Sequence, residues 1–130
     1  MSRIVHLALK VEDLEKATAF YQNVFGFREV HTHKHSDHVS RHMTDGAFDF
    51  TLMKYDESVE STERDAAGVN PCIHHFAVEV DDIEKYTAEL KKQGCEIISR
   101  PGKLPVKFRA PDGIVAELVP AGRYEKSGVR

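Results

Sequence analysis

The sequence predicts an α+β fold in which two βαβββ modules pair into a curved eight-stranded cup, with their helices on the outer face. Three observations support this prediction: a segment that occurs twice, an alternation typical of strands at the start of each copy, and a capped helix after each strand. The 130-residue chain is 41% hydrophobic and 30% charged, which is ordinary for one globular domain with its own core.

The repeated segment aligns His6–Ala19 with His75–Ala88, and eight of the fourteen positions are identical. Average composition would give about one match by chance. We therefore interpret the chain as a duplication of one structural unit. The first module covers about residues 3–55 and the second about residues 71–120.

Both modules belong to one expected domain, residues 1–120. Residues 56–70 are polar, acidic and without periodicity, so we expect a solvated loop between the modules. Residues 121–130 are predicted to form a mostly loose tail.

Each module begins with a strand and continues with a helix. In the first strand Val5, Leu7 and Leu9 share one face and His6 lies on the other, a position that His75 takes in the second copy. Asp N-caps and Gly C-caps bound the helices, in the pairs Asp13 with Gly26 and Asp82 with Gly94. Strands are then expected at residues 25–35, 38–43, 47–55, 95–101, 106–111 and 115–120.

Charge and composition exclude several classes of partner. A net charge of -3 and a pI near 6.2 leave no broad basic surface, so we expect no nucleic acid and no membrane as partner. The apolar runs are too short to span a bilayer and the amino terminus lacks a signal-peptide pattern, which predicts a cytoplasmic protein. Cys72 and Cys95 are then expected as free thiols.

Strand parity sorts the candidate functional residues. The face with Val5 must meet the helix, so His6 and His75 turn into the cup while His74 points toward the helix. In the last strand, Glu117 is a lone carboxylate among apolar residues, and leaving a buried carboxylate unpaired costs about 3 to 5 kcal/mol. A divalent ion bound by two imidazoles and one carboxylate would remove that cost.

Two alternatives from the residues stay open. Glu117 can instead be a rim residue that pairs with Lys107 or Arg109. The alternating His31, His33 and His35 can bind a second metal, although a run of this kind is more often a solvated hairpin.

Three segments, residues 5–27, 73–94 and 110–120, resemble the vicinal oxygen chelate superfamily, which includes glyoxalase I, extradiol dioxygenases and bleomycin-binding proteins. The resemblance extends to about Pro120. It implies one divalent metal ion, Fe, Mn, Ni, Zn or Co, held by His6, His75 and Glu117, with Glu117 also serving as the catalytic base.

The family's fourth ligand has no match. Some members place Glu or Gln where this chain has Thr51, and Asp49, of equal parity, is an outside candidate for the missing carboxylate. We therefore expect three protein ligands. The predicted substrate pocket contains Arg41, His42, Thr51 and Arg109.

The resemblance favours a metal-dependent enzyme that chelates two neighbouring oxygens of a small substrate, with glyoxalase-like lyase chemistry or extradiol dioxygenase chemistry. The alternative is a non-catalytic protein that binds an antibiotic or another small molecule and confers resistance. A homodimer is expected from the resemblance and from the open sheet edges.

Overall fold

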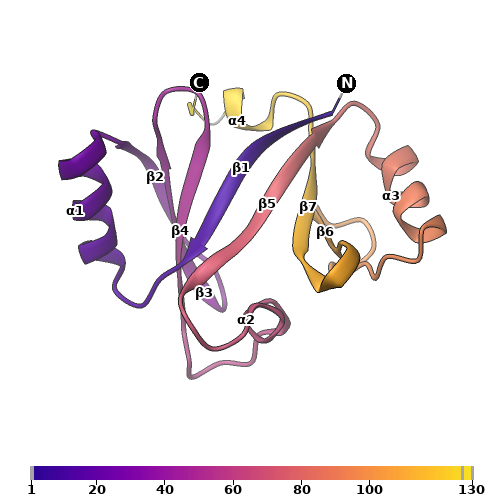
Figure 1. The fold of residues 1–130 in the computed structure, drawn as a ribbon, viewed down its shortest axis with the longest axis horizontal. Helices are drawn as coiled ribbons and strands as arrows, with labels where there is room; N and C mark the ends of the chain where they lie inside the picture. Colours follow the sequence, from indigo (N-terminus) through magenta and orange to yellow (C-terminus); the bar gives the residue numbers. More distant parts are fainter. Residues whose placement is uncertain (1, 127, 130) are drawn as a thin grey trace.

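The computed structural model describes residues 2–126, 128 and 129 (Figure 1). The first half of the chain contains β1 (Arg3–Lys10), α1 (Leu14–Phe25), β2 (Arg28–Lys34), β3 (His38–Thr44) and β4 (Asp49–Tyr55). After α2 (Thr62–Ala67), the second half contains β5 (Cys72–Val80), α3 (Ile83–Lys92), β6 (Val106–Arg109), β7 (Val115–Pro120) and α4 (Arg123–Lys126). A 3-10 turn at Pro111–Gly113 joins β6 to β7.

The strands form one curved, unclosed sheet in the order β2-β3-β4-β1-β5-β7-β6. The strands that open the repeat, β1 and β5, pair antiparallel in the middle. β4 runs parallel beside β1 and β7 runs parallel beside β5. The two halves of one chain therefore join edge to edge and build the cup together.

The sequence predicts eight strands, whereas the part of the chain that the structure describes contains seven. The strand predicted at residues 95–101 is reduced to one bridge, between Ile97 and Phe108. The amide of Lys107 donates to the side-chain Oγ of Ser99 at 3.0 Å, where a regular ladder would use a backbone carbonyl. Two prolines, Pro101 and Pro105, follow and lack an N–H for pairing, so the ladder ends early.

The helices α1 and α3 lie at opposite flanks of the sheet (Figure 1). Each begins at the predicted cap: Asp13 accepts from the amide of Lys16 at 2.9 Å and Asp82 from that of Lys85 at 3.0 Å. On α1, Tyr21 packs against the ring of Phe50. The apolar residues of α3 pack on the second module in the same way, namely Ile83, Tyr86 and Leu90.

Two β-bulges interrupt the ladder between β1 and β5. The register passes from Ile4 to His6 and, on the other strand, from His75 to Ile73, so Val5 and His74 are the extra residues. A bulge breaks the alternation of faces. The prediction that Val5 and His74 face the helices is therefore wrong, since Val5 packs with buried residues of the cup and the ring of His74 lies against that of His75.

Part of the predicted tail packs against the sheet, while its residues 127 and 130 lie outside the described part of the chain. Tyr124 is 4% exposed and Val129 is buried completely, and both pack with Val5 over the concave side of the sheet. The connecting segment after Tyr55 also contains a short helix, α2, capped by Ser61, where we expected an irregular loop. Of the described helices, none is long and apolar enough to cross a membrane.

Candidate metal centre

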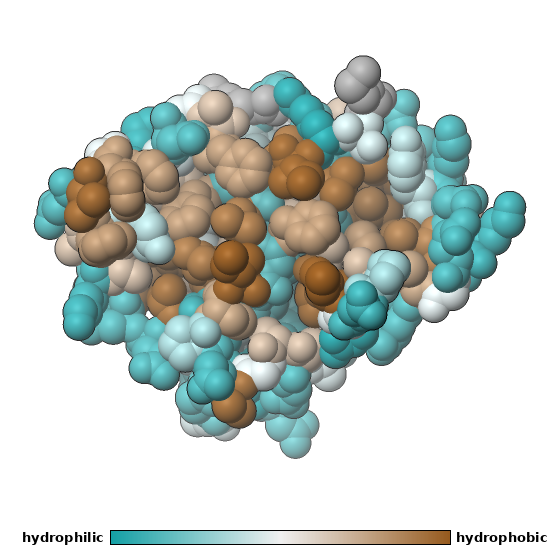
Figure 2. Space-filling model, viewed as in Figure 1, coloured by the Kyte–Doolittle hydropathy of each residue, from teal (hydrophilic) through white to brown (hydrophobic). Residues whose placement is uncertain are grey.

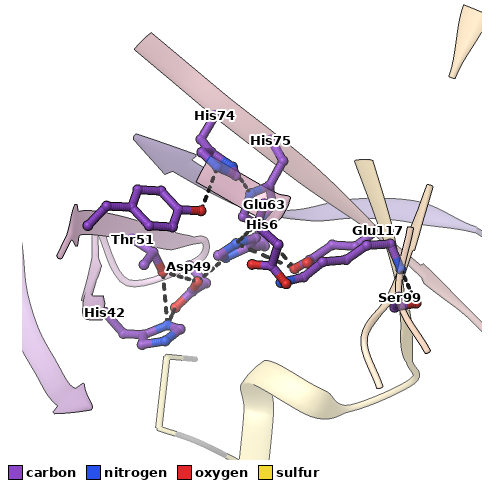
Figure 3. A network of polar contacts seen from close by, with 11 residues as sticks. His6, His42, Asp49, Thr51, Glu63, His74, His75, Ser99 and Glu117 are labelled. Atoms are coloured by element: carbon purple, nitrogen blue, oxygen red, sulfur yellow. Dashed lines mark hydrogen bonds and ion pairs between the residues drawn. The ribbon is translucent and has the colours of Figure 1, made fainter. Parts of the chain in front are cut away.

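His6, His75 and Glu117 come together from three adjacent strands, β1, β5 and β7 (Figure 3). The backbone register pairs His6 with Ala77, and Ala77 with Glu117, which brings the side chains to one level of the cup. All three are buried, with exposures of 3%, 6% and 3%. The triad expected from parity and resemblance is therefore assembled within one chain.

The donor atoms of this triad converge. His6 Nε2 lies 3.1 Å from His75 Nε2 and 3.7 Å from Glu117 Oε1, and His75 Nε2 lies 3.4 Å from the same oxygen. Atoms that share one ion at about 2.1 Å are spaced roughly 3.0 to 3.4 Å apart in octahedral or tetrahedral geometry. Two imidazoles and a carboxylate are also a donor set that divalent transition metals accept. The residues fit a divalent ion.

A carboxylate lies behind His6. Asp49 accepts from Nδ1 of His6, from Nδ1 of His42 at 2.8 Å and from the hydroxyl of Thr51 at 2.8 Å. Thr51, which the resemblance placed at the fourth-ligand position, thus binds Asp49 and not the triad (Figure 3). Asp49 itself contacts the nitrogen of His6 that faces away from His75 and Glu117.

A neutral group lies behind His75. Its Nδ1 is 2.6 Å from Nδ1 of His74, and Nε2 of His74 is 2.8 Å from the hydroxyl of Tyr55. The bulge at His74 makes this contact possible, because it turns two consecutive side chains into the cup. Sequence parity missed this role, since parity holds only for an unbroken ladder.

The electrostatics favour the protonation states that bind metal. Burial by itself would raise the pKa of Glu117, but the imidazoles of His75 and His6 hold this pKa at about 2. Burial lowers the pKa of His6, although its bond to Asp49 acts in the opposite direction. Burial and the neighbouring His75 lower the pKa of His74 to about 3. An ionised carboxylate and neutral imidazoles are the forms that ligate an ion.

The triad opens into a cavity of about 960 Å³. Of the predicted pocket residues, His42 and Thr51 line this cavity, and Arg41 and Arg109 do not. Arg41 instead donates to Thr18 on α1 at 2.9 Å, and the guanidinium of Arg109 donates to the carbonyl of Gly113 at 3.1 Å. Parity puts Arg41 and His42 on opposite faces of β3, but it could not tell which of the two faces the cup.

The cavity wall also contains an aromatic residue that the sequence did not single out. Tyr124 stacks on the ring of His6, with centroids 5.2 Å apart and planes within 7°. Only its aromatic character in a polar tail could have drawn attention to it. Lys107 lines the cavity too, but its ammonium pairs with Glu63 at 2.6 Å, so it is not the dedicated partner of Glu117.

The alternating histidines of β2 do not converge on a second metal site. Among the described residues, the two groups with ligand atoms close enough to share an ion are His6, His75 and Glu117, and His6, His42 and Asp49. The rings of His31 and His33 contact each other edge to face. The hypothesis of a separate ion on this strand therefore has no geometric support.

The chain is similar to a known protein family and to known enzymes along nearly its whole length. The family model for the Glyoxalase/Bleomycin resistance protein/Dioxygenase superfamily matches residues 3–118. Lactoylglutathione lyase of Neisseria meningitidis is 27% identical over 142 residues, which cover 97% of this chain and 93% of that protein. Mitochondrial methylmalonyl-CoA epimerase of Homo sapiens is 29% identical over 132 residues, covering 91% of this chain and 73% of that one.

The fold has solved counterparts. Methylmalonyl-CoA epimerase from Mycobacterium tuberculosis superposes with a TM-score of 0.71, covering 95% of this chain and 91% of that chain. At 21% sequence identity, this likeness shows a common fold.

Proposed function

The chain belongs to the glyoxalase/bleomycin resistance protein/dioxygenase superfamily, and from this premise we propose that it is a metal-dependent enzyme acting on a small carbonyl compound. His6, His75 and Glu117 hold one divalent ion, and the substrate binds through two neighbouring oxygens in the cavity beside them. The proposed reaction class is proton transfer at the carbon next to the carbonyl.

One observation carries the proposal: three buried donor atoms, 3.1 to 3.7 Å apart, open onto a cavity large enough for a small substrate. A divalent ion bound there supplies Lewis-acid stabilisation of the negative charge that develops on a substrate oxygen. Glu117 is the proposed base. Its contacts to both imidazoles use Oε1, which leaves Oε2 as the atom that accepts the proton.

The relatives favour proton transfer over ring-cleaving oxygenation. Both a lactoylglutathione lyase and a methylmalonyl-CoA epimerase are similar to this chain along nearly its whole length. Inversion of a carbon centre, which the word epimerase denotes, requires loss and return of a group at that carbon. Dioxygenase chemistry at the same three ligands is the second candidate, and binding without turnover is the third.

Solvent exchange tests the proposal directly. Protein with one equivalent of Co(II), Ni(II), Zn(II), Mn(II) or Fe(II) is incubated in D2O with α-hydroxyketones, hemithioacetals of α-ketoaldehydes, and acyl thioesters. We expect deuterium to enter at the carbon next to the carbonyl, as detected by proton NMR. Chelator-treated protein is the control, and activity should return when the metal is restored.

Two results would overturn this assignment. Uptake of dioxygen with a catechol, without carbon–hydrogen exchange, would establish the oxygenase class. Tight binding of these compounds with neither exchange nor oxygen uptake would make the protein a binding module.

We also propose a homodimer through the outer face of the sheet. Apolar side chains gather there over β1 and β5 and on the neighbouring α1 (Figure 2). Ile4 is 57% exposed, Ile73 67% and Phe25 61%. The face crosses the seam between two similar modules, and such a surface suits a second copy related by a two-fold axis. Light scattering at micromolar concentration should give twice the chain mass, and Ile73→Lys should give the monomer.

A further inference from the structure

The buried carboxylate of Asp49 is the centre of a hydrogen-bond cluster that the proposed reaction does not use. Asp49 is 0% exposed and does not line the cavity. Its Oδ2 accepts from His6 Nδ1 and from the hydroxyl of Thr51, and its Oδ1 accepts from His42 Nδ1. An ionised carboxylate has no proton to donate. All three contacts therefore require the proton to lie on the partner.

This requirement fixes the tautomers of two imidazoles. With its proton on Nδ1, neutral His6 carries the lone pair on Nε2, the atom that faces His75 and Glu117. His42, with Nδ1 held by Asp49 and also 2.9 Å from Thr51, likewise has its lone pair on Nε2. The His42 side chain is 17% exposed and lines the cavity, so this free nitrogen is available to a bound molecule.

A direct ligand role for Asp49 fits less well. His6, His42 and Asp49 form a second group with ligand atoms near one another. However, an ion there would need Nδ1 of His6, whereas the triad needs Nε2 of the same ring, and the close contact between Nδ1 and Oδ2 is that of a hydrogen bond. A carboxylate that receives the distal N–H of a ligating histidine is a common arrangement, and it orients the ring and strengthens the donor.

We propose that Asp49 is a positioning residue that holds the Nδ1 protons of His6 and His42, so that Nε2 of His6 is presented to the metal and Nε2 of His42 to the substrate cavity. Thr51 supports the carboxylate by its hydroxyl. Asp49 and Thr51, the two candidates for a fourth ligand, thus support His6 instead, and the site keeps three protein ligands. The part concerning the metal rests on the proposed function, whereas the tautomers do not.

The first test uses the metal-free, unmodified protein. Long-range nitrogen–proton NMR correlations with ¹⁵N-labelled histidine assign the tautomer of each ring, with single His→Gln variants to identify the signals. We expect the Nδ1–H form for His6 and for His42. The Nε2–H form of His6 in the folded protein would overturn the proposal, whatever the protein catalyses.

The second test compares Asp49→Asn with Asp37→Asn. Asp37 is a matched control, because it also holds an imidazole, that of His38 at 2.6 Å, and a hydroxyl, that of Ser61 at 2.5 Å, but touches no residue of the triad. His6 and His42 contact different oxygens of Asp49. In Asp49→Asn one of these oxygens becomes an NH2 donor, so the side chain presents an acceptor to only one of the two imidazoles. We expect Zn(II) affinity, measured by chelator competition, to fall about 10- to 100-fold in Asp49→Asn and to stay unchanged in Asp37→Asn.

The outcomes separate this inference from the proposed function. Loss of affinity and altered tautomers in Asp49→Asn, in a protein that exchanges no substrate proton, would support the positioning role and reject the reaction. Equal Zn(II) affinity in Asp49→Asn and the unmodified protein would overturn the positioning role. A change of the Co(II) spectrum that shows one oxygen ligand fewer in Asp49→Asn would also overturn it, because Asp49 would then be a ligand.

Discussion

His6 and His75 occupy equivalent positions of the repeat, yet the groups behind them differ. His6 is backed by a buried carboxylate, Asp49, and His75 by a second imidazole, His74, that ends on the hydroxyl of Tyr55. Two similar strands thus carry two similarly placed histidines, while the hydrogen-bond partners of these histidines differ. An anionic acceptor makes an imidazole a stronger donor to metal than a neutral acceptor does.

The neutral partner also determines which nitrogens of His75 and His74 carry their protons. To offer Nε2 to an ion, His75 must keep its proton on Nδ1 and donate it to Nδ1 of His74. His74 then carries its own proton on Nε2 and donates it to the oxygen of Tyr55. A charged group thus holds His6, whereas a chain of neutral groups, in which the protons have one workable orientation, holds His75.

The largest expected effect is a loss of metal affinity when a residue of the triad itself is removed. His6→Ala and Glu117→Ala each remove a proposed ligand, so metal affinity should fall by more than about 100-fold, the upper range for outer partners. Elemental analysis after gel filtration measures the metal that remains. His33→Ala, at an exposed position of β2, serves as control. Full metal content in both ligand variants would show that the ion binds elsewhere.

The stability of the metal-free protein should fall as the pH is lowered below about 6.5. His6 and His74 have pKa values in the fold that lie below the ordinary value of 6.5. The unfolded chain therefore takes up protons first, and stability present above about pH 6.5 is lost progressively toward lower pH. His74, with a pKa of about 3 in the fold, should contribute about 1 kcal/mol of this loss at about pH 5.5, and His6 should add to the loss in the same direction.

Urea unfolding in the presence of a chelator, at about pH 8 and about pH 5.5, on either side of the ordinary histidine pKa, measures this loss. In His74→Ala the difference in unfolding free energy between the two pH values should be smaller by the contribution of His74. An equal midpoint at both pH values in the unmodified protein would mean that these imidazoles take up protons as readily in the fold as in the unfolded chain.

A smaller loss of metal affinity is expected when only the group behind His75 is removed. His74→Ala removes the group that orients His75, and metal affinity should fall about tenfold, at the low end for an outer partner because this partner is neutral. Chelator competition with Zn(II) measures it beside Asp49→Asn. If His74→Ala cost more affinity than Asp49→Asn, the carboxylate would not be the stronger support.

The smallest loss of metal affinity should come from a change at Tyr55, the last group in the hydrogen-bond chain behind His75. Tyr55→Phe removes only the hydroxyl that meets Nε2 of His74, so we expect a loss of metal affinity of about threefold, the range of one ordinary hydrogen bond. The same titration detects it, with the His74 tautomer from NMR as a second readout. A loss of about tenfold or more would show that Tyr55 does more than terminate the chain.

Most of the framework could be predicted from local patterns. Asp13 and Asp82 begin their helices as expected, because an N-cap acts within one turn of its own residue. His6, His75 and Glu117 face one cup, because the alternation of a strand and the offset of the repeat are visible in the residues themselves. Membership in the superfamily follows from the same segments.

Other features depend on contacts between distant parts of the chain. The bulges at Val5 and His74 arise where β1 and β5 must pair with unequal residue counts, which no single strand reveals. Tyr124 reaches His6 only after the chain has passed through every strand of the sheet. The missing strand near Ile97 reflects competition by a side chain, Ser99, for a backbone amide.

The same distinction between local and long-range information separates the proposed ligands from the residues that hydrogen-bond to them. Residue type and strand period, which are local, were enough to place two imidazoles and a carboxylate in one cup. Whether Asp49 and Thr51 would join them or stand behind them depended on packing: on which nitrogen of His6 faces β4 and which faces β5. An imidazole can present either of its two nitrogens, and only the positions of the neighbouring strands decide which nitrogen meets Asp49 and which meets the triad.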